Sequence, residues 1–160
     1  MEDTLNGARS AAGLAGFFAD LVRCETRLYN ALNDRLRERH GIVTSQYEFL
    51  GYLHRHPGCR VADLAAEFAI GVGATSKGVD RLEKQGWAAR RPNPADRRSS
   101  LLVLTDEGTR LVEAAERTVT EGLAELLADT LDAAALAAAA GALATLRAAL
   151  ERDQVGIPTG

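Results

Sequence analysis

The spacing of apolar residues changes from a helical to a strand pattern just after Gly86. Upstream of it, residues 44–86 hold three short segments whose apolar residues recur every three or four positions, which is typical of amphipathic helices. Downstream, two five-residue runs, WAARR and SLLVL, flank a turn that contains two prolines. The middle of the chain therefore predicts three short helices followed by a β-hairpin.

Longer helical patterns lie on both sides of this middle part. Residues 12–41 carry a stripe of leucine and phenylalanine at spacings of three, four and seven, and such a helix is about 40 Å long. Residues 106–150 carry two further apolar stripes, the last within AAALAAAAGALA. These stripes exceed what one protomer can cover. We therefore expect a homodimer held together by residues 12–41 and 106–150, with a flexible N-terminus at 1–11 and a flexible tail at 151–160.

The composition is that of a soluble globular protein, because the 160 residues are 46% hydrophobic and 26% charged. We expect no apolar run that approaches the roughly 20 residues of a membrane span, and the acidic, polar start does not resemble a signal peptide. A cytoplasmic protein with no membrane partner is therefore expected. Cys24 and Cys59 are far apart and have no second ligand at metal spacing, which argues against a disulfide framework and a metal site.

The net charge of −3 conceals an uneven distribution. Residues 1–58 are neutral, residues 59–105 carry +3 and residues 106–160 carry −6. A basic middle part in an acidic chain indicates a segment that faces a polyanion.

The stretch GVGATSKG, residues 71–78, has the small residues and the lysine that let a backbone approach phosphate. It does not match a nucleotide-binding loop, since a helical pattern precedes it where a Rossmann fingerprint requires a strand. Ser76 also stands where a Walker A loop requires the glycine before its lysine. The expected phosphates are therefore those of a nucleic acid.

The order of three helices and a hairpin with a basic tip is that of a winged helix-turn-helix domain, which we place at residues 42–105. The third helix of such a domain enters the major groove of DNA, while the hairpin reaches along the backbone. Helical geometry puts Val72 and Thr75 on the buried face of the third helix. Gly78 has no side chain, so we expect it to let the DNA-facing side of this helix approach the duplex closely. We assign its DNA-facing side to Gly73, Ala74, Ser76, Lys77 and Arg81.

Three segments of the chain, SQYEFLGYL, VADLAAEF and SKGVDRLEKQGWAARRPNPADRRSSLLVLTDEG, resemble the MarR family of transcription regulators. The last segment is similar to the family signature, in which the wing bears an Asp-x-Arg, here Asp96 and Arg98. The resemblance, over roughly residues 12–150, implies a triangular homodimer on pseudo-palindromic double-stranded DNA. It also implies that Arg98 enters the minor groove and that Asp96 orients it, which agrees with the attraction of a narrow minor groove for guanidinium.

Further contacts to the DNA backbone are assigned to basic and hydroxyl side chains near the expected interface. The chain departs from the family pattern at Cys59, before the second helix of the winged domain, and at Gly71–Val72–Gly73, before the third. Base preference is therefore expected to differ. The residues assigned to backbone contacts are Arg90, Arg91 and Arg97 on the hairpin, and Thr44, Ser45 and Arg60 at helix starts.

The resemblance also implies an effector, because members of the family commonly respond to small phenolic or aromatic acids in a crevice between the dimer helices and the winged domain. Others respond to oxidants through a cysteine. Cys59 precedes a helix start, where the helix dipole and Arg60 are expected to lower its thiol pKa, and Cys24 is the second candidate. The crevice candidates, which packing or surface ion pairs also explain, are Arg23, Arg27, Tyr29, His40, Tyr47, Tyr52 and His54.

The leading hypothesis is a homodimeric, DNA-binding transcription regulator, a repressor released by a small-molecule effector. Two alternatives are a winged-fold dimer that acts as a protein-binding adaptor, and a cysteine-based redox-sensing regulator. An enzyme is not expected, because no nucleophile–base pair or carboxylate pair stands out, and neither a catalytic residue nor a cofactor is assigned.

Overall fold

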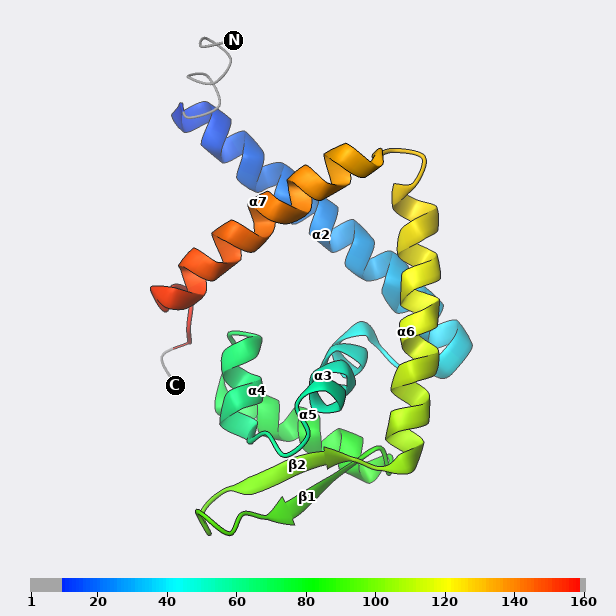
Figure 1. The fold of residues 1–160 in the computed structure, drawn as a ribbon, viewed down its shortest axis with the longest axis vertical. Coiled ribbons are helices and arrows are strands. Elements are labelled where there is room, and N and C mark those ends of the chain that lie inside the picture. Colours follow the sequence, from blue (N-terminus) through cyan, green and yellow to red (C-terminus); the bar gives the residue numbers. More distant parts are fainter. Residues whose placement is uncertain (1–9, 159–160) are drawn as a thin grey trace.

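The computed structural model describes residues 10–158, which form long helices around a small domain of three short helices and an antiparallel hairpin (Figure 1). This confirms the predicted fold class, mainly α with a β-hairpin wing. The predicted flexible N-terminus, residues 1–11, lies almost entirely outside the described residues. The elements in chain order are α2 (Ala11–His40), α3 (Thr44–Arg55), α4 (Val61–Glu67), α5 (Val72–Lys84), β1 (Ala88–Pro92), β2 (Ser100–Leu104), α6 (Asp106–Leu127) and α7 (Ala133–Arg152).

The long helices begin at side-chain caps that the sequence supplies. Ser10, Thr105 and Asp132 each accept a hydrogen bond from the backbone amide three residues further on, at 3.1, 3.0 and 2.8 Å. Each cap satisfies an amide that the first turn of a helix leaves without a partner. At the other end of α2, Gly41 takes φ +68°, a left-handed conformation that glycine adopts without strain.

The winged domain closes around a core of its own, to which α6 and the end of α2 contribute. β1 and β2 pair in antiparallel register with Arg90 opposite Leu102. Cys59 forms an isolated bridge to Leu102, which ties the loop before α4 to the hairpin. The domain therefore covers its apolar face within one chain. The large apolar side chains that are fully buried are Leu36, Ile42, Leu50, Leu53, Leu64, Val79, Leu82 and Leu102.

α2 and α6 pack against each other at close range. A Cβ added at Gly122 of α6 would lie 3.1 Å from Cδ of Arg35 and 3.2 Å from Cδ2 of Leu32, both on α2. An ion pair between Arg39 and Glu121, 2.9 Å long, bridges the two helices. Both of its side chains are about half exposed, so water screens the pair and packing contributes most of the stability here.

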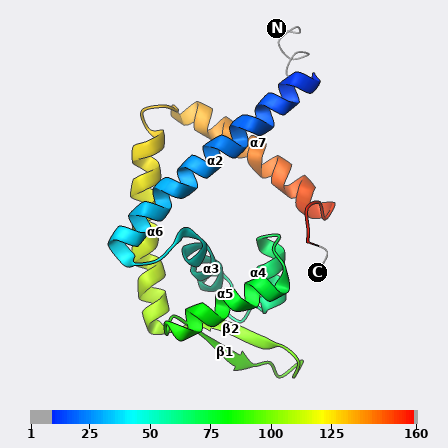
Figure 2. The same ribbon diagram turned by 180° about the vertical axis from the view of Figure 1, so that it is seen from behind.

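α7 turns back from α6 and crosses α2 in both views (Figures 1 and 2). It contains no buried residue. The phenylalanines near the start of α2, Phe17 and Phe18, are also exposed, at 56% and 65%. The two ends of the described chain therefore present apolar side chains that this chain does not cover, including Leu136, Leu143, Leu146 and Leu150 of α7.

The alanine-rich α7 also corrects one expectation from the sequence. Among the helices of residues 10–158, α7 alone is long and apolar enough to cross a membrane by length and composition. Its many alanines raise the mean hydropathy although each side chain is small. One such helix is weak evidence for a membrane, because the core helix of a soluble protein satisfies the same length and composition.

Candidate nucleic-acid interface

The outer face of α5 carries the side chains that the helical pattern assigned to it. Lys77 and Arg81 are exposed, Ser76 is half-buried at the border, and Thr75 is fully buried. The Thr75 hydroxyl donates to the backbone oxygen of Gly71 at 3.0 Å, which satisfies this buried polar group. Gly73 and Ala74, in the first turn, are exposed as well.

Two details of α5 differ from the sequence prediction. Val72 was expected on the buried face, but it is the first residue of the helix and remains 56% exposed, because the core does not extend to that turn. Gly78 was expected to keep the front of the helix low. A Cβ there would lie 2.6 Å from Cε2 of Phe49, so this glycine admits the Phe49 ring of α3 against α5.

The wing tip is held by hydrogen bonds within its own turn. The Asp96 carboxylate accepts from the backbone amide of Arg98 at 2.9 Å, and the side-chain amide of Asn93 donates to Oγ of Ser99 at 2.8 Å. Arg97 and Arg98 are exposed. Asp96 thus shapes the backbone that carries Arg98, whereas the sequence reasoning expected the carboxylate to hold the guanidinium itself.

The two arginines of β1 differ sharply in their surroundings. The Arg90 guanidinium donates to Asp80 at 2.8 Å and forms an ion pair with Glu83, both on α5, and only 25% of its side chain is exposed. The side chain of Arg91 is exposed and makes no hydrogen bond or ion pair with residues 10–158. Of the two arginines predicted to contact the DNA backbone, Arg91 therefore has a free guanidinium and Arg90 does not.

Of the hydroxyl and basic residues assigned at helix starts, Ser45 is exposed, and its side chain is a hydrogen-bond partner of Tyr29. Thr44 is buried, its amide donates to Asn33, and its hydroxyl donates to the backbone oxygen of Tyr29. This burial removes Thr44 from the surface that a phosphate can reach. The Arg60 guanidinium is engaged by the Asp63 carboxylate at 2.8 and 3.1 Å.

A small groove joins the start of α3 to α5 and has a volume of about 180 Å³. It brings together Ser45, Ala74 and Arg81, three of the residues assigned to DNA. Val43 and Gln46 also line it, and the sequence reasoning missed both. Gln46 carries a usable signal, because its side-chain oxygen accepts from the Val43 amide at 3.0 Å and so fixes the start of α3.

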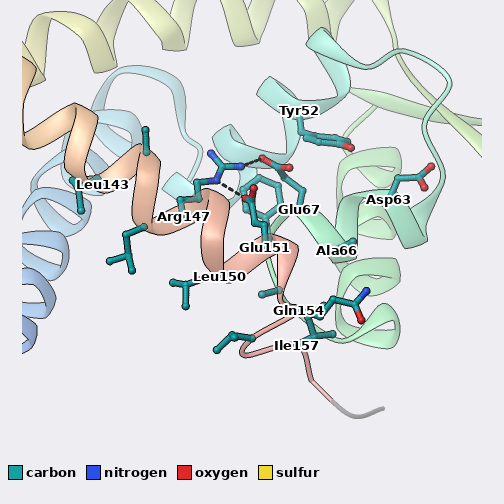
Figure 3. A pocket seen from close by; sticks show the side chains of 15 residues that line it. Tyr52, Asp63, Ala66, Glu67, Leu143, Arg147, Leu150, Glu151, Gln154 and Ile157 are labelled. Atoms are coloured by element: carbon teal, nitrogen blue, oxygen red, sulfur yellow. Dashed lines mark hydrogen bonds and ion pairs between the residues drawn. The ribbon is translucent and has the colours of Figure 1, made fainter.

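A pocket of about 1030 Å³ lies between the winged domain and α7 (Figure 3). Of the predicted crevice residues, only Tyr52 lines it. Tyr29 lies elsewhere, where its hydroxyl donates to Glu48 at 3.4 Å, and burial raises the pKa of Glu48. His40 contacts the Thr118 hydroxyl on α6. Among the other candidates Tyr47 is half-buried, whereas Arg23, Arg27 and His54 are exposed and outside the pocket.

The pocket takes its charged group from α7, which sequence reasoning did not consider. The Arg147 guanidinium donates to Glu67 of α4 at 2.8 Å and also pairs with Glu151 one turn along α7. Leu143 and Leu150 add apolar lining on the same side (Figure 3). The signal available in the sequence was Arg147, the first charged residue of the apolar helix α7.

The two cysteines occupy different surroundings. Burial and the nearby Asp63 carboxylate raise the pKa of the Cys59 thiol to about 11. The sequence predicted a lowered value from Arg60, but that guanidinium pairs with Asp63 and offers little net positive charge. A thiol with a raised pKa forms little of the reactive thiolate, so Cys59 is a poor oxidant sensor. Cys24 is exposed on α2.

Comparisons with known proteins point to the same winged domain. The family profile described as "MarR family" matches residues 40–99, which span the winged domain except its second strand. The multiple antibiotic resistance protein MarR of Escherichia coli (strain K12) is 28% identical over 110 residues, covering 66% of this chain and 76% of that protein. Matching curated relatives carry the names of transcriptional regulators, one of a repressor and one of an activator, rather than of enzymes.

The extent of these matches varies. The chain spans about half the length of the first curated relatives that it matches, between 48% and 54%. Solved structures cover more of it. CouR, a transcriptional repressor bound to a 23-mer DNA duplex, has a TM-score of 0.74 and 26% identity, with 80% of this chain and 89% of that chain covered.

The fold extends over nearly all of the chain. Sco3205, a MarR family transcriptional regulator from Streptomyces coelicolor in complex with DNA, has a TM-score of 0.81 with 93% of this chain and 94% of that chain covered. Its 23% identity concerns the fold alone. The family profile over the winged domain, the curated relatives and the shared winged fold together support a MarR family winged helix-turn-helix regulator.

Proposed function

We propose that the protein is a homodimeric, DNA-binding transcription regulator that acts in the cytoplasm. The observation that carries the proposal is the pairing state of its cations. Arg90 and Arg60 of the winged domain form ion pairs, as do four of the nine arginines of the long helices, Arg35, Arg39, Arg147 and Arg152. Along the outer face of α5 and the wing tip, the cations have no such partner in residues 10–158; these are Lys77, Arg81, Arg97 and Arg98.

Unpaired cations on a helix and a hairpin that project from one domain match what a duplex offers. The helix meets base edges in the major groove, and a guanidinium at the wing tip meets the strong negative potential of the minor groove. Lys77 and Arg81 supply the first set of contacts, and Arg98 supplies the second. The solved CouR complex with a DNA duplex supports this arrangement by analogy.

The dimer rests on the uncovered apolar side chains of α7 and of the start of α2. Leucines at 39–44% exposure on a helix with no buried residue leave an apolar stripe in water, which a second copy covers. Two copies related by a two-fold axis present two α5 helices, which fits half-sites about 34–36 Å apart on one face of DNA. The partner DNA is therefore a pseudo-palindromic duplex.

The test uses the tightest duplex recovered by selection from a random-sequence library. The wild-type protein should bind it with an affinity that falls steeply with salt, because each phosphate contact releases counterions. Arg98→Ala should weaken binding roughly tenfold, whereas Arg117→Ala on the exposed side of α6 should change it less than about twofold. Failure to recover any duplex, or a salt slope near zero, would favour the adaptor alternative.

An effector site follows from the pocket between α4 and α7. An aromatic acid fits it, because its ring meets Tyr52 and Phe68 of the winged domain and its carboxylate competes with Glu67 for the Arg147 guanidinium. Salicylate at millimolar concentration should release the selected duplex from the wild-type protein. Arg147→Gln should abolish that release and Arg152→Gln, at the end of the same helix, should preserve it. Equal release from both variants would place the effector elsewhere.

A further inference from the structure

The Arg90 side chain leaves the hairpin and lies along α5. Its Nη1 atom is 2.8 Å from Oδ1 of Asp80 and also pairs with Glu83, while Nη2 lies 3.3 Å from Oγ and 3.4 Å from the backbone oxygen of Ser76. The Arg90 backbone amide donates to Glu83 as well, at 3.0 Å. One arginine thus joins β1 to three residues of α5.

These three partners form a stripe on one side of α5. Ser76, Asp80 and Glu83 are separated by four and three positions, so they lie on the same face of a helix and span about 10 Å of its length. A contact spread over two turns fixes an angle as well as a distance. The guanidinium is suited to this, because its planar fork donates in several directions at once.

Arg90 is the outermost side-chain attachment between the hairpin and α5. Closer to the base, the Trp87 amide donates to the backbone oxygen of Leu82 at 3.0 Å. Beyond Arg90, no hydrogen bond of the described chain joins residues 91–100 to α5, and the side-chain hydrogen bonds of these residues stay within the turn. On the other strand, the bridge between Cys59 and Leu102 holds the hairpin to the loop before α4. Arg90 is therefore the outermost direct polar link that sets the position of the wing tip relative to α5.

We propose that Arg90 is a positioning residue of the DNA interface, which holds the wing at a fixed angle to α5 so that both engage one duplex. This rests on the proposed DNA binding. Arg98 can reach the minor groove only while Lys77 and Arg81 sit in the major groove, so the hairpin must not swing. Arg90 itself contacts no phosphate, because Asp80 and Glu83 hold its guanidinium.

The sign of one double substitution separates positioning from phosphate contact. Asp80→Ala with Glu83→Ala removes two negative charges from a helix that faces DNA, which by electrostatics alone strengthens binding. It also frees Arg90, which would strengthen binding further if this arginine contacts phosphate. If Arg90 positions the wing, the double variant should instead bind the selected duplex roughly tenfold more weakly, within the range for coupled contacting residues. Stronger binding would overturn the proposal.

Two single substitutions on β1 give a matched comparison. Arg90→Met should weaken binding with no change in the salt slope, because no phosphate contact is lost. Arg91→Met, one residue along the same strand, should reduce the slope by about 1 if it contacts phosphate. Arg90→Lys, which keeps one charged donor without the fork, should restore part of the affinity. A salt slope lowered by Arg90→Met would contradict the positioning role.

Coupling to the wing tip provides the readout that a merely destabilising substitution would not move. Arg98→Ala should cost roughly tenfold in the wild-type background but less than about twofold in the Arg90→Met background, because a misplaced wing no longer delivers Arg98. The thermal midpoint of each variant shows whether it is folded at the assay temperature. Independent, multiplicative effects of the two substitutions in folded variants would overturn the proposal.

The same experiments separate this inference from the proposed function. If the wild-type protein selects no duplex, DNA binding itself fails, and so does the role of Arg90. If the wild type binds and Arg98→Ala weakens it, while the Arg90 variants behave as phosphate contacts, only the positioning role fails.

Discussion

The winged domain and helix α7 differ in how much of their apolar surface one chain covers. Leu53 and Leu82 of the winged domain are fully buried, whereas Leu143 and Leu146 of α7 are 44% and 39% exposed. In the sequence, both regions carry leucines at the same helical spacing. The periodicity of the leucines therefore identifies a helix face that must be buried, but not which chain buries it.

The largest expected effect tests whether the winged domain is complete within one chain. Leu53→Ala should lower the free energy of unfolding by about 2–5 kcal/mol, because it removes a fully buried side chain from a core with little room to relax. Val72→Ala, at a residue that is 56% exposed, should change it by less than about 0.5 kcal/mol. Urea denaturation followed by far-UV circular dichroism measures both. Similar small losses would mean that this core is not closed.

The second effect tests whether a partner covers α7. Leu143→Glu should raise the dimer dissociation constant at least about 100-fold, because it places an unpaired charge in the apolar interface. Thr145→Glu, on the opposite face of the same helix, is the matched control and should have a smaller effect. Analytical ultracentrifugation gives the dissociation constant. A wild-type protein that is monomeric at micromolar concentration would contradict the proposal that a second copy covers α7.

A third prediction concerns the packing of α5 against α3. Gly78→Ala should cost about 1 kcal/mol, because its Cβ meets the Phe49 ring at 2.6 Å and the ring must shift. Gly73→Ala, on the same helix with open space around it, should instead stabilise by up to about 1 kcal/mol through helix propensity. Opposite signs in thermal unfolding are the expected result. Stabilisation by both would show that the ring moves freely.

The smallest effect lies where α2 meets α6. Burial, together with Arg39 and Arg117, lowers the pKa of His40. The unfolded chain therefore takes up the proton first, so this contribution to stability is complete above about pH 6.5 and is lost as the pH falls toward the folded pKa. His40→Gln should flatten the decline in unfolding free energy between pH 7.5 and 5.5. An unchanged slope would show that His40 does not contribute to it.

Much of the interface was predictable because it depends on local pattern. The outward position of Lys77 and the burial of Thr75 follow from 3.6 residues per turn, and the exposed Arg98 follows from a turn rich in proline. The state of Arg90 was not predictable, since its partners on α5 meet it only after the hairpin folds back. The prediction of a lowered pKa for Cys59 was wrong for the same reason, because the burial of its thiol and the pairing of Asp63 with Arg60 arise only in the folded chain.

The sequence by itself determined the elements of this protein, their order and the faces they present, because caps, periodicity and turn residues act over a few positions. Only the tertiary structure decided which charges are free and which are paired. The sequence pattern does not indicate that a guanidinium and a carboxylate seven or eighty residues apart form an ion pair. Arg90 with Glu83 and Arg147 with Glu67 are the two examples. Both arise where separate elements pack, and the physical reason is that ion pairing depends on distance in space rather than along the chain.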